Sequence, residues 1–249
     1  MILSQWNKKG GFDLLESVDL TKKITDKAEY NELLKQYQLR FLRMQRELQQ
    51  SERSLIIVVE GWDAGGKGGA IRRFTQRLDP RGFNVYGTQA PVGIERKEHY
   101  LKRFWKNIPN DGKIAVFDRS WYGRVLVERI EGFATKNEWK RAYEEINQFE
   151  KMLTDDGTII LKFWFHISKD EQLRRFEERQ NNPFKRWKIT DEDWRNREKW
   201  DEYVQAAEDM FEKTNKKNAP WYIISGENKW YGRIQTIQTI VETLEKEMQ

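Results

Sequence analysis

The 249-residue chain contains no cysteine, two histidines and five prolines. Without cysteine it can form neither a disulfide nor a thiolate nucleophile, and this composition suits a reducing compartment, so we expect a cytoplasmic protein. Catalysis by a nucleophilic histidine is not favoured with only His99 and His166 available, and we expect His166, at the end of an apolar stretch, to be structural. No linker rich in Pro, Gly or Ser divides the sequence, which favours one domain over residues 1–249.

Long apolar runs are also missing. No stretch approaches the roughly 18 apolar residues that a membrane span requires, and the first residues lack the basic-then-apolar pattern of a signal peptide. We therefore expect no membrane partner. Charged residues make up 34% of the chain, with acidic and basic side chains interleaved. The formal net charge of +5 fits either simple solubility or a polyanionic partner.

An amphipathic helix is predicted over residues 25–50. Its apolar residues recur at three- and four-residue steps and would share one face: Leu34, Tyr37, Phe41, Met44 and Leu48. This face could pack on the domain or on a second subunit. We expect the first twenty or so residues to wrap the surface, so that residues 1–52 form an N-terminal helical extension.

Five apolar, β-branched or aromatic stretches alternate with helical patterns further along the chain. They cover residues 55–59, 84–88, 113–117, 158–166 and 221–224. Strands that alternate with helices predict an α/β fold with a five-stranded parallel sheet and right-handed crossovers. Two later helices have capping signals, Ser168 with Glu171 and, more weakly, Thr190 with Asp193.

The strongest local signal is the sequence GWDAGGKGG at residues 61–69, between the first predicted strand and a helix. The pattern G-x-x-x-x-G-K at such a turn is typical of a P-loop. Its glycines let successive backbone N–H groups face one phosphate, and Lys67 would reach the terminal phosphoryl oxygens. The alternative is a glycine-rich turn that serves only the fold.

Two aspartates are candidate Mg²⁺ ligands. The Ser or Thr that usually follows the loop lysine, and whose hydroxyl ligates the metal, is replaced by Gly68. Asp63 inside the loop is the nearest residue that could supply an oxygen instead. Asp118 ends a predicted strand, where P-loop sheets place a second metal-binding aspartate. The alternative role for Asp118 is to cap the next turn.

Arginines follow Asp118 closely. Arg119, Arg124 and Arg129 could each bind phosphate oxygens bidentately. For Arg124 and Arg129 the alternative is an ion pair with Glu128 or Glu131. The helix after Ser168 carries Arg174, Arg175 and Arg179, and the next loop carries Lys185, Arg186 and Lys188. This segment, residues 168–200, resembles the lid of small phosphotransferases, although it could be only a solvated charged helix.

Taken together, these motifs resemble the polyphosphate kinase 2 family. The similar stretches are EGWDAGGKGGAI at 60–71, LDPRG at 78–82, FDRSWYGRVLVER at 117–129, FKRWK at 184–188 and WRNREKW at 194–200. The resemblance runs from about residue 15 to the end, and the family shares the glycine at position 68. It implies a three-layer α/β/α fold related to thymidylate kinase, with a helical lid. It also implies an enzyme that transfers phosphoryl groups reversibly between inorganic polyphosphate and adenine nucleotides (AMP, ADP, ATP), with Mg²⁺ or, in its place, Mn²⁺.

The resemblance also implies roles for individual residues. The expected catalytic residues are Asp63, Lys67, Asp118, Arg119 and Arg179, of which Asp63 and Asp118 bind the metal. The expected phosphate- and nucleotide-binding residues are Gly61, Ala64, Gly65, Gly66, Gly68, Gly69, Arg124 and Arg129. The expected polyphosphate channel and lid contain Arg72, Arg81, Arg175, Lys185, Arg186 and Lys188. We expect a homo-oligomer, dimer or tetramer, that binds no nucleic acid.

The residues around Gly123 are similar to the branch of the family that phosphorylates AMP to ADP, and this favours AMP as the acceptor. The alternatives are a polyphosphate:ADP phosphotransferase that makes ATP and an ATP-dependent nucleoside monophosphate kinase. The second would normally keep Ser or Thr at position 68. A basic P-loop module that binds nucleic acid without catalysis is the non-enzymatic alternative.

Overall fold

The computed structural model describes residues 14–248. It contains one five-stranded parallel sheet with the strand order β2-β3-β1-β4-β5. The strands are β1 (Leu55–Gly61), β2 (Phe83–Gly87), β3 (Ile114–Asp118), β4 (Ile159–His166) and β5 (Trp221–Ser225). All five lie where the sequence predicts strands, and the predicted α/β class is confirmed. The predictions for residues 1–13 fall outside the described residues.

The α-helices and short 3-10 turns connect these strands. The α-helices are α1 (Lys27–Leu48), α2 (Lys67–Thr75), α3 (Lys102–Trp105), α4 (Val127–Ile130), α5 (Lys136–Asp155), α6 (Lys169–Gln180), α7 (Asp191–Glu198), α8 (Trp200–Thr214) and α9 (Lys229–Glu247). The 3-10 turns are η2 (Pro80–Gly82), η3 (Gly93–Lys97), η4 (Trp121–Arg124) and η5 (Arg186–Lys188).

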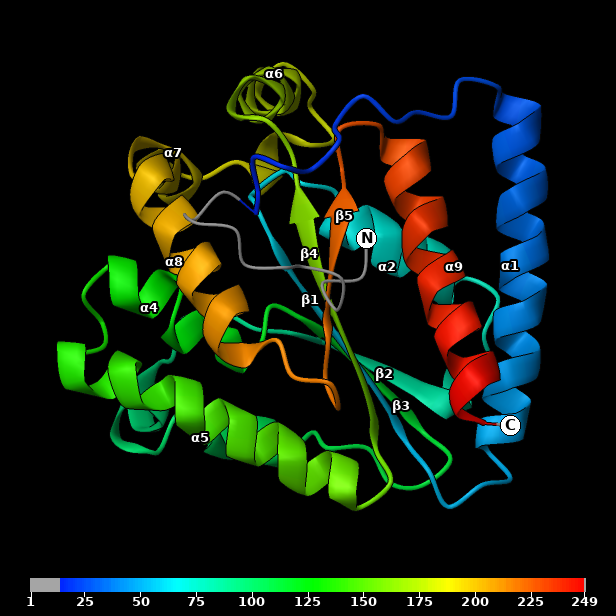
Figure 1. Cartoon of the computed structure of the whole chain (residues 1–249). Helices are drawn as coiled ribbons and strands as arrows, with labels where there is room; N and C mark the ends of the chain where they lie inside the picture. The colour runs from blue at the N-terminus through cyan, green and yellow to red at the C-terminus, as the bar shows by residue number, and fades with distance from the viewer. Residues whose placement is uncertain (1–13, 249) are drawn as a thin grey trace.

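Helices cover both faces of the sheet and make three layers (Figure 1). The residues of β1 are buried on both sides, because successive side chains point to opposite faces. Ile56 and Val58 pack in one core with residues of α5 and α8. Leu55, Ile57 and Val59 pack in the other core with residues of α1, α2 and α9. A strand enclosed in this way reads as the continuous apolar run seen in the sequence.

Helix α1 packs on this domain along most of its length, beside α9 (Figure 1). Its buried face includes Leu34, Phe41, Met44 and Leu48, as the three- and four-residue spacing predicts. Leu39 remains 51% exposed on the opposite side of the helix. The choice left open by the sequence is therefore decided for these residues in favour of packing within the chain.

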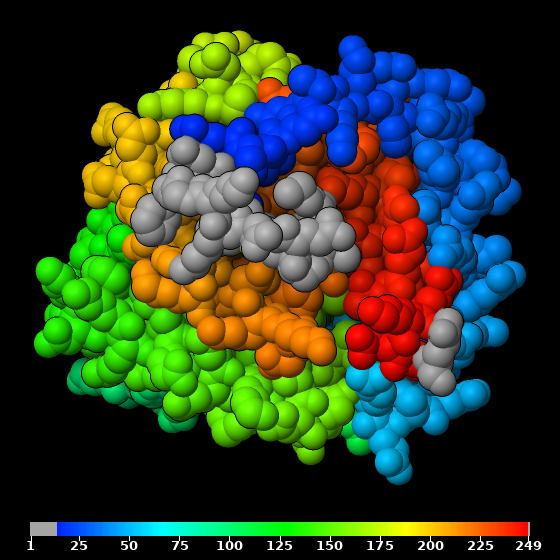
Figure 2. Space-filling model, viewed as in Figure 1, coloured from blue at the N-terminus to red at the C-terminus, as the bar shows by residue number. Residues whose placement is uncertain are grey.

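Residues 14–26 cross the surface from the α8 side to α1, seen in dark blue in Figure 2. This path agrees with a segment that wraps the surface, but Leu14 and Leu15 are buried in the core. The Leu15 N–H also donates to the Glu208 carboxylate of α8 at 2.7 Å. The sequence shows no periodicity here, because two residues suffice to anchor the segment.

A charged pair is buried inside the core between β4 and α5. The Lys162 ammonium lies 2.7 Å from the Glu150 carboxylate, and their side chains are 0% and 1% exposed. Lys162 also donates to the Tyr122 hydroxyl and to the Thr214 carbonyl. The Glu150 carboxylate accepts from Tyr122 and from the Trp121 indole. The pair therefore joins β4, α5, η4 and the end of α8.

We predict that Lys162→Met lowers the free energy of unfolding by about 3–5 kcal/mol, because it leaves the Glu150 charge buried without a partner. The double variant Lys162→Met/Glu150→Gln should recover much of this loss, since the amide is neutral and its oxygen still accepts from Trp121 and Tyr122. Urea denaturation measures both values. Lys151→Met, which removes an exposed pair with Asp155, is the control and should change stability by less than about 1 kcal/mol. Equal losses in the single and double variants would contradict the account.

Candidate active site

The candidate site lies at the carboxyl edge of the sheet, where β1 and β3 end side by side. Val59 of β1 is in register with Asp118, the last residue of β3. Because all strands are parallel, the loop that leaves β1 and the turn that leaves β3 emerge at the same edge. The loop runs from Gly61 to Gly66 and leads into α2. The two motifs that the sequence singles out are thus neighbours in space.

The loop depends on glycine where it approaches β4. Gly61 has φ of +128°, and a Cβ atom there would lie 2.4 Å from the Phe165 carbonyl oxygen. Gly66 has φ of +114° and is the N-cap of α2. Other residues would be strained at both positions. The Trp62 N–H donates to the Phe165 carbonyl at 3.1 Å and holds the loop against this strand.

Two residues other than glycine also have left-handed backbones, Ala64 with φ of +59° and Arg119 with φ of +64°. Such conformations cost of order 1–3 kcal/mol and cluster at functional sites. Arg119 turns the chain directly after β3, and its N–H donates to the Val59 carbonyl at 3.0 Å. The turn directs its guanidinium to the loop, where it lies 2.8 Å from an Asp63 carboxylate oxygen.

Lys67 begins α2 and folds back across its own loop. Its ammonium donates to the carbonyls of Gly61 at 2.6 Å and Trp62 at 2.9 Å. Burial lowers the pKa of Lys67, while the charges of Asp63 and Asp118 act in the opposite direction. Both predicted metal-binding carboxylates therefore lie close enough to act electrostatically on the lysine amine.

Asp63 is held on both carboxylate oxygens. Oδ1 accepts from Arg119 at 2.8 Å, and Oδ2 accepts from the Asn196 amide of α7 at 2.9 Å. Burial alone would raise the pKa of Asp63, but the charges of Lys67 and Arg119 and these hydrogen bonds outweigh it and lower the pKa. Asp63 is therefore an anion at neutral pH.

A third acidic residue, Glu60, lies beneath the site and is 5% exposed. Its Oε1 accepts from the Ser120 N–H at 2.7 Å and from the Ser120 hydroxyl at 2.8 Å. Burial raises the pKa of Glu60, against the lowering effect of the Ser120 hydrogen bonds and the Lys67 charge. By fixing Ser120, this side chain fixes the turn that carries Arg119.

Within residues 14–248 no group of three or more His, Cys, Asp or Glu residues could hold a metal ion alone. Mg²⁺ is commonly bound through one or two carboxylates together with substrate phosphates and water. Asp63 and Asp118 fit this pattern, and each Asp63 oxygen retains a second lone pair beyond its hydrogen bond.

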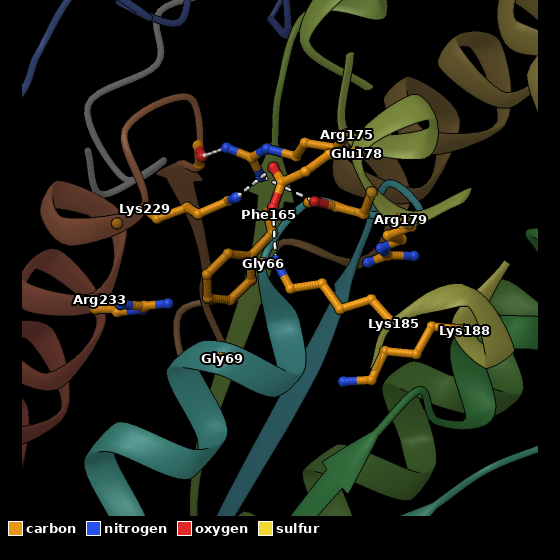
Figure 3. Close-up of a pocket in the computed structure, with 14 residues that line it drawn as sticks. Gly66, Gly69, Phe165, Arg175, Glu178, Arg179, Lys185, Lys188, Lys229 and Arg233 are labelled. Carbon is orange, nitrogen blue, oxygen red and sulfur yellow. Dashed lines mark hydrogen bonds and ion pairs between the residues drawn. The ribbon is translucent and has the colours of Figure 1, made fainter. Parts of the chain in front are cut away.

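The loop separates two cavities. The first, which we call the basic pocket, has a volume of about 220 Å³ and lies against Ala64, Gly65, Gly66 and Gly69. Figure 3 shows side chains from the lid and from α9 converging over the start of α2. Six of them are cationic, namely Arg175, Arg179, Lys185, Lys188, Lys229 and Arg233, against one acid, Glu178. A cavity of this charge at the N-terminus of a helix is suited to a polyanion.

The second cavity, which we call the mixed pocket, has a volume of about 200 Å³ and lies on the β3 side of the loop. Its wall contains Gly61, Trp62, Asp63 and Arg119, together with apolar side chains. Those apolar residues are Leu126, Val127, Phe133, Trp164 and Tyr203, and the charged residues Arg103, Glu128 and Arg195 complete the wall. Apolar surface with a few polar groups is typical of a pocket for an organic ligand.

A family model for polyphosphate kinase 2 matches residues 24–249. The chain belongs to the polyphosphate kinase 2 family. It is 48% identical over 94% of its length to a polyphosphate:AMP phosphotransferase of Pseudomonas syringae pv. tomato, of which it covers 47%. It is 53% identical over 78% of its length to a polyphosphate:AMP phosphotransferase of Acinetobacter johnsonii, of which it covers 40%. The chain thus spans about half the length of these curated relatives.

A solved structure of the same family supports the fold assignment. The polyphosphate kinase 2 of Arthrobacter aurescens TC1 superposes with a TM-score of 0.89 at 34% identity, over 96% of this chain and 87% of that one. The resemblance to polyphosphate kinase 2 found in the sequence and the α/β fold that it implies are both confirmed.

Several predicted site residues of this polyphosphate kinase 2 family member do meet in space. Asp63, Lys67 and Arg119 interact around the loop, as described above. Gly65, Gly66, Arg179, Lys185 and Lys188 line the basic pocket. Their catalytic and binding roles remain predictions. Gly68 is exposed and a Cβ atom there would meet nothing within 4 Å, so packing does not require glycine at this position.

Arg175 has a different role from the one expected. Its side chain is 3% exposed, and it donates to the carbonyls of Ala64, Gly226 and Glu227 and to the Glu171 carboxylate. The prediction that it belongs to a mobile group of lid cations is therefore corrected. Arg175 instead bonds the phosphate loop to the β5–α9 connection, although one edge of its guanidinium reaches the basic pocket.

The structure also moves three predicted arginines away from the phosphates. Arg81 precedes β2, at the amino-terminal edge of the sheet, and is paired with Asp79. Its assignment to the same channel as the lid is wrong, because the loop lies at the opposite edge. Arg124 pairs with Glu128 at 3.2 Å, the alternative left open by the sequence. Arg129 pairs with Asp209 at 2.7 Å instead of with Glu128 or Glu131.

The two remaining arginines of the predicted channel do not line the basic pocket. Arg186 is exposed on η5. Arg72 lies on α2 and lines a groove between α1, α2 and α9.

Sequence reasoning missed Lys229 and Arg233, which come to the basic pocket from α9. They are four residues apart at the start of a helix, so they share a face, and that spacing after the N-cap Asn228 could have identified them. It also missed Asn196, whose amide binds Asp63 and whose oxygen accepts from the Tyr203 hydroxyl at 3.0 Å. Nothing local in the sequence marks Asn196 for this contact.

The loop has one pH-sensitive support, His166. Its Nδ1 accepts a hydrogen bond from the Trp62 indole at 3.0 Å, and burial lowers its pKa to about 4. The unfolded chain, with an ordinary histidine pKa near 6.5, binds more protons than the folded one between these values. Stability therefore falls as the pH decreases from about 6.5 to about 4, by at most about 3 kcal/mol.

We predict that His166→Gln flattens this part of the pH dependence, because the amide does not titrate but can still accept from Trp62. Urea denaturation of both proteins at several pH values between 4 and 7 measures the difference. His99→Gln, at a mostly exposed position, is the matched control and should leave the profile unchanged. Parallel profiles for the wild type and His166→Gln would refute the role of His166.

Proposed function

We propose that this protein transfers the terminal phosphoryl group of inorganic polyphosphate to an adenine nucleotide, with AMP favoured over ADP as acceptor and the reaction reversible. The observation that carries the proposal is the division of the site by the phosphate loop. The basic pocket presents six cations and little apolar surface beyond Phe165, which suits a donor made only of phosphates. The mixed pocket presents apolar surface beside Arg119, which suits a nucleotide.

The names of the relatives support this assignment of donor and acceptor. Two relatives that share about half of their residues with this chain are polyphosphate:AMP phosphotransferases. A more distant relative from Pseudomonas aeruginosa, 35% identical over 87% of this chain and 61% of its own length, is a GDP-polyphosphate phosphotransferase. The preference for AMP rests on the higher identity to the first group and on the sequence around Gly123.

The residues of the chain account for the chemistry as follows. An oxygen of the acceptor phosphate attacks the terminal phosphorus of the donor. The bond to the bridging oxygen breaks, and the shortened polyphosphate leaves with the electron pair. The acceptor is already an anion, so no general base is needed, in agreement with the lack of a titrating histidine at the site. Catalysis then consists of positioning and charge stabilisation.

Lys67 and Arg119 are placed for that task. In the structure they bind the loop carbonyls and Asp63, so their donors are satisfied and oriented before any phosphate arrives. Phosphate oxygens would take over these hydrogen bonds, Lys67 on the donor side and Arg119 on the acceptor side. Arg179 of the lid would cover the transferred group from the basic pocket and exclude water.

We further propose that Asp63 and Asp118 hold Mg²⁺, or Mn²⁺ in its place. When bound, the ion neutralises charge on the transferred group. No helix within residues 14–248 is long and apolar enough to cross a membrane. A cytoplasmic location, suggested by the lack of cysteine, and a homo-oligomeric state remain parts of the proposal.

A panel of nucleotides tests the donor and the acceptor. With long-chain polyphosphate and Mg²⁺ we expect AMP to be consumed faster than ADP, GMP or GDP, and we expect ATP to be a poor donor to AMP. Chromatography of the nucleotides measures all of these rates. Faster use of ADP would refute the choice of acceptor, and efficient transfer from ATP would favour a nucleoside monophosphate kinase.

Substitution of the second aspartate tests the catalytic centre. Asp118→Asn should lower kcat by about 100-fold or more, because a carboxylate that faces the transferred charge is lost, and should leave thermal unfolding unchanged. Asp155→Asn, an exposed change of the same kind on α5, is the control and should retain full activity. Near-normal turnover of Asp118→Asn would remove Asp118 from the mechanism.

The non-enzymatic alternative makes a separate prediction about the loop lysine. If the protein only bound nucleic acid, Lys67→Ala would retain salt-sensitive binding of DNA or RNA and the wild type would show no phosphoryl transfer. We expect instead that Lys67→Ala loses transfer activity.

A further inference from the structure

A long open groove lies beside the basic pocket, between α1, α2 and α9. It has a volume of about 720 Å³, and we call it the helix groove. Its walls carry Lys27 and Lys35 of α1, Arg72, Arg73 and Arg77 of α2, and Arg233 of α9. The other residues that line it are Tyr30, Asn31, Leu34, Gln38, Leu39, Leu42, Gln76 and Trp230.

The charge of the helix groove differs from that of the rest of the surface. Six of its lining residues are cationic and none is acidic. Among residues 14–248 none of these six cations forms an ion pair, whereas exposed helical cations elsewhere do, as in Arg40–Glu245, Lys102–Glu98 and Lys151–Asp155. Unpaired cations gathered in one depression repel one another, and the arrangement costs stability unless an anion binds.

The helix groove continues directly from the basic pocket. Arg233 lines both cavities. Its guanidinium lies beside Gly69 on the first turn of α2, where a Cβ atom would approach its Nη2 to 3.3 Å. Figure 3 shows Arg233 extending from α9 across this turn. An anion too long for the basic pocket could therefore pass Arg233 and meet the α2 arginines next.

We infer that the helix groove binds the distal part of a linear polyphosphate whose terminal phosphates occupy the basic pocket. The inference rests on the proposed function and assigns a second, extended subsite to its donor. Each additional phosphate that meets a cation releases counterions, so long chains should bind more tightly than short ones. The terminal group would stay in the same place whatever the chain length.

Two other occupants fit the helix groove less well. Single-stranded nucleic acid is bound by aromatic side chains on which bases stack, but Trp230 is stacked on Tyr30 at 5.2 Å between ring centroids and 14° between ring planes. A second copy of this chain on a two-fold axis would place the same unpaired cations opposite one another. A polyanion without bases satisfies both constraints.

The test compares donors of different length. Lys35 and Arg77 are exposed and lie outside the basic pocket, so Lys35→Gln/Arg77→Gln should fold normally. With AMP as acceptor we expect this variant to raise the KM for long-chain polyphosphate about tenfold, because two phosphate contacts are lost. The KM and kcat for tripolyphosphate should not change. Lys151→Gln, an exposed substitution on α5 across the sheet, is the matched control and should change neither donor.

Each other outcome has a defined meaning. If neither donor is affected, or if both are affected equally, the inference is wrong. If the wild type transfers phosphate from neither donor, the proposed function fails. Direct titration of long-chain polyphosphate, by tryptophan fluorescence at two salt concentrations, still tests the helix groove in that case. Lower affinity and a weaker salt dependence in the variant would support it.

Two further outcomes would assign the helix groove to another partner. Loss of binding to single-stranded RNA with unchanged affinity for polyphosphate would identify a nucleic-acid surface. A change of oligomeric state in analytical ultracentrifugation, without a change in polyphosphate affinity, would identify a subunit interface. Either result would overturn the inference.

Discussion

The close approach of the phosphate loop to the end of β4 determines the geometry of the whole site. Gly61 passes so near to the Phe165 carbonyl that no side chain fits between them, and the Trp62 N–H bonds the same carbonyl. The indole of Trp62 stacks on Trp200 at 3.8 Å between ring centroids and donates to His166. With the loop fixed in this way, Asp63 faces β3 and Gly66 faces the lid, and two cavities of different chemistry arise on its two sides.

The charged groups around the loop are mutually satisfied in the absence of substrate. Lys67 binds loop carbonyls, Arg119 binds Asp63, and Ser120 binds Glu60. This network keeps buried charges from remaining unpaired, which would otherwise cost several kcal/mol. It also means that the catalytic cations are ordered in advance, so that little conformational entropy has to be lost when phosphates bind.

The sequence predicted the sheet well, because the five strands are continuous apolar runs or alternate clearly with helical patterns. It also predicted that Asp63, Lys67 and Arg119 meet, since their positions follow from strand ends in a parallel sheet. It could not place side chains whose position depends on tertiary packing. Arg175 looked like a lid cation, but its burial beneath the lid depends on carbonyls contributed by two other segments. Lys229 and Arg233 join the site only because α9 packs beside α2, and Arg81 is excluded only because the short strand β2 carries the chain across the sheet.

The hydrogen bonds of the lid define how it can close. At the start of the lid, Arg175 of α6 is bonded to the loop and to the β5–α9 connection. At its end, Asn196 of α7 is bonded to Asp63 and to Tyr203. Residues 181–190 lie between these two anchors, and their hydrogen bonds and ion pairs remain within the lid itself. A segment tethered at both ends cannot swing outward like a door. It descends as a strap, and the exposed rings of Phe184 and Trp187 travel with the lysines that it brings down onto the donor.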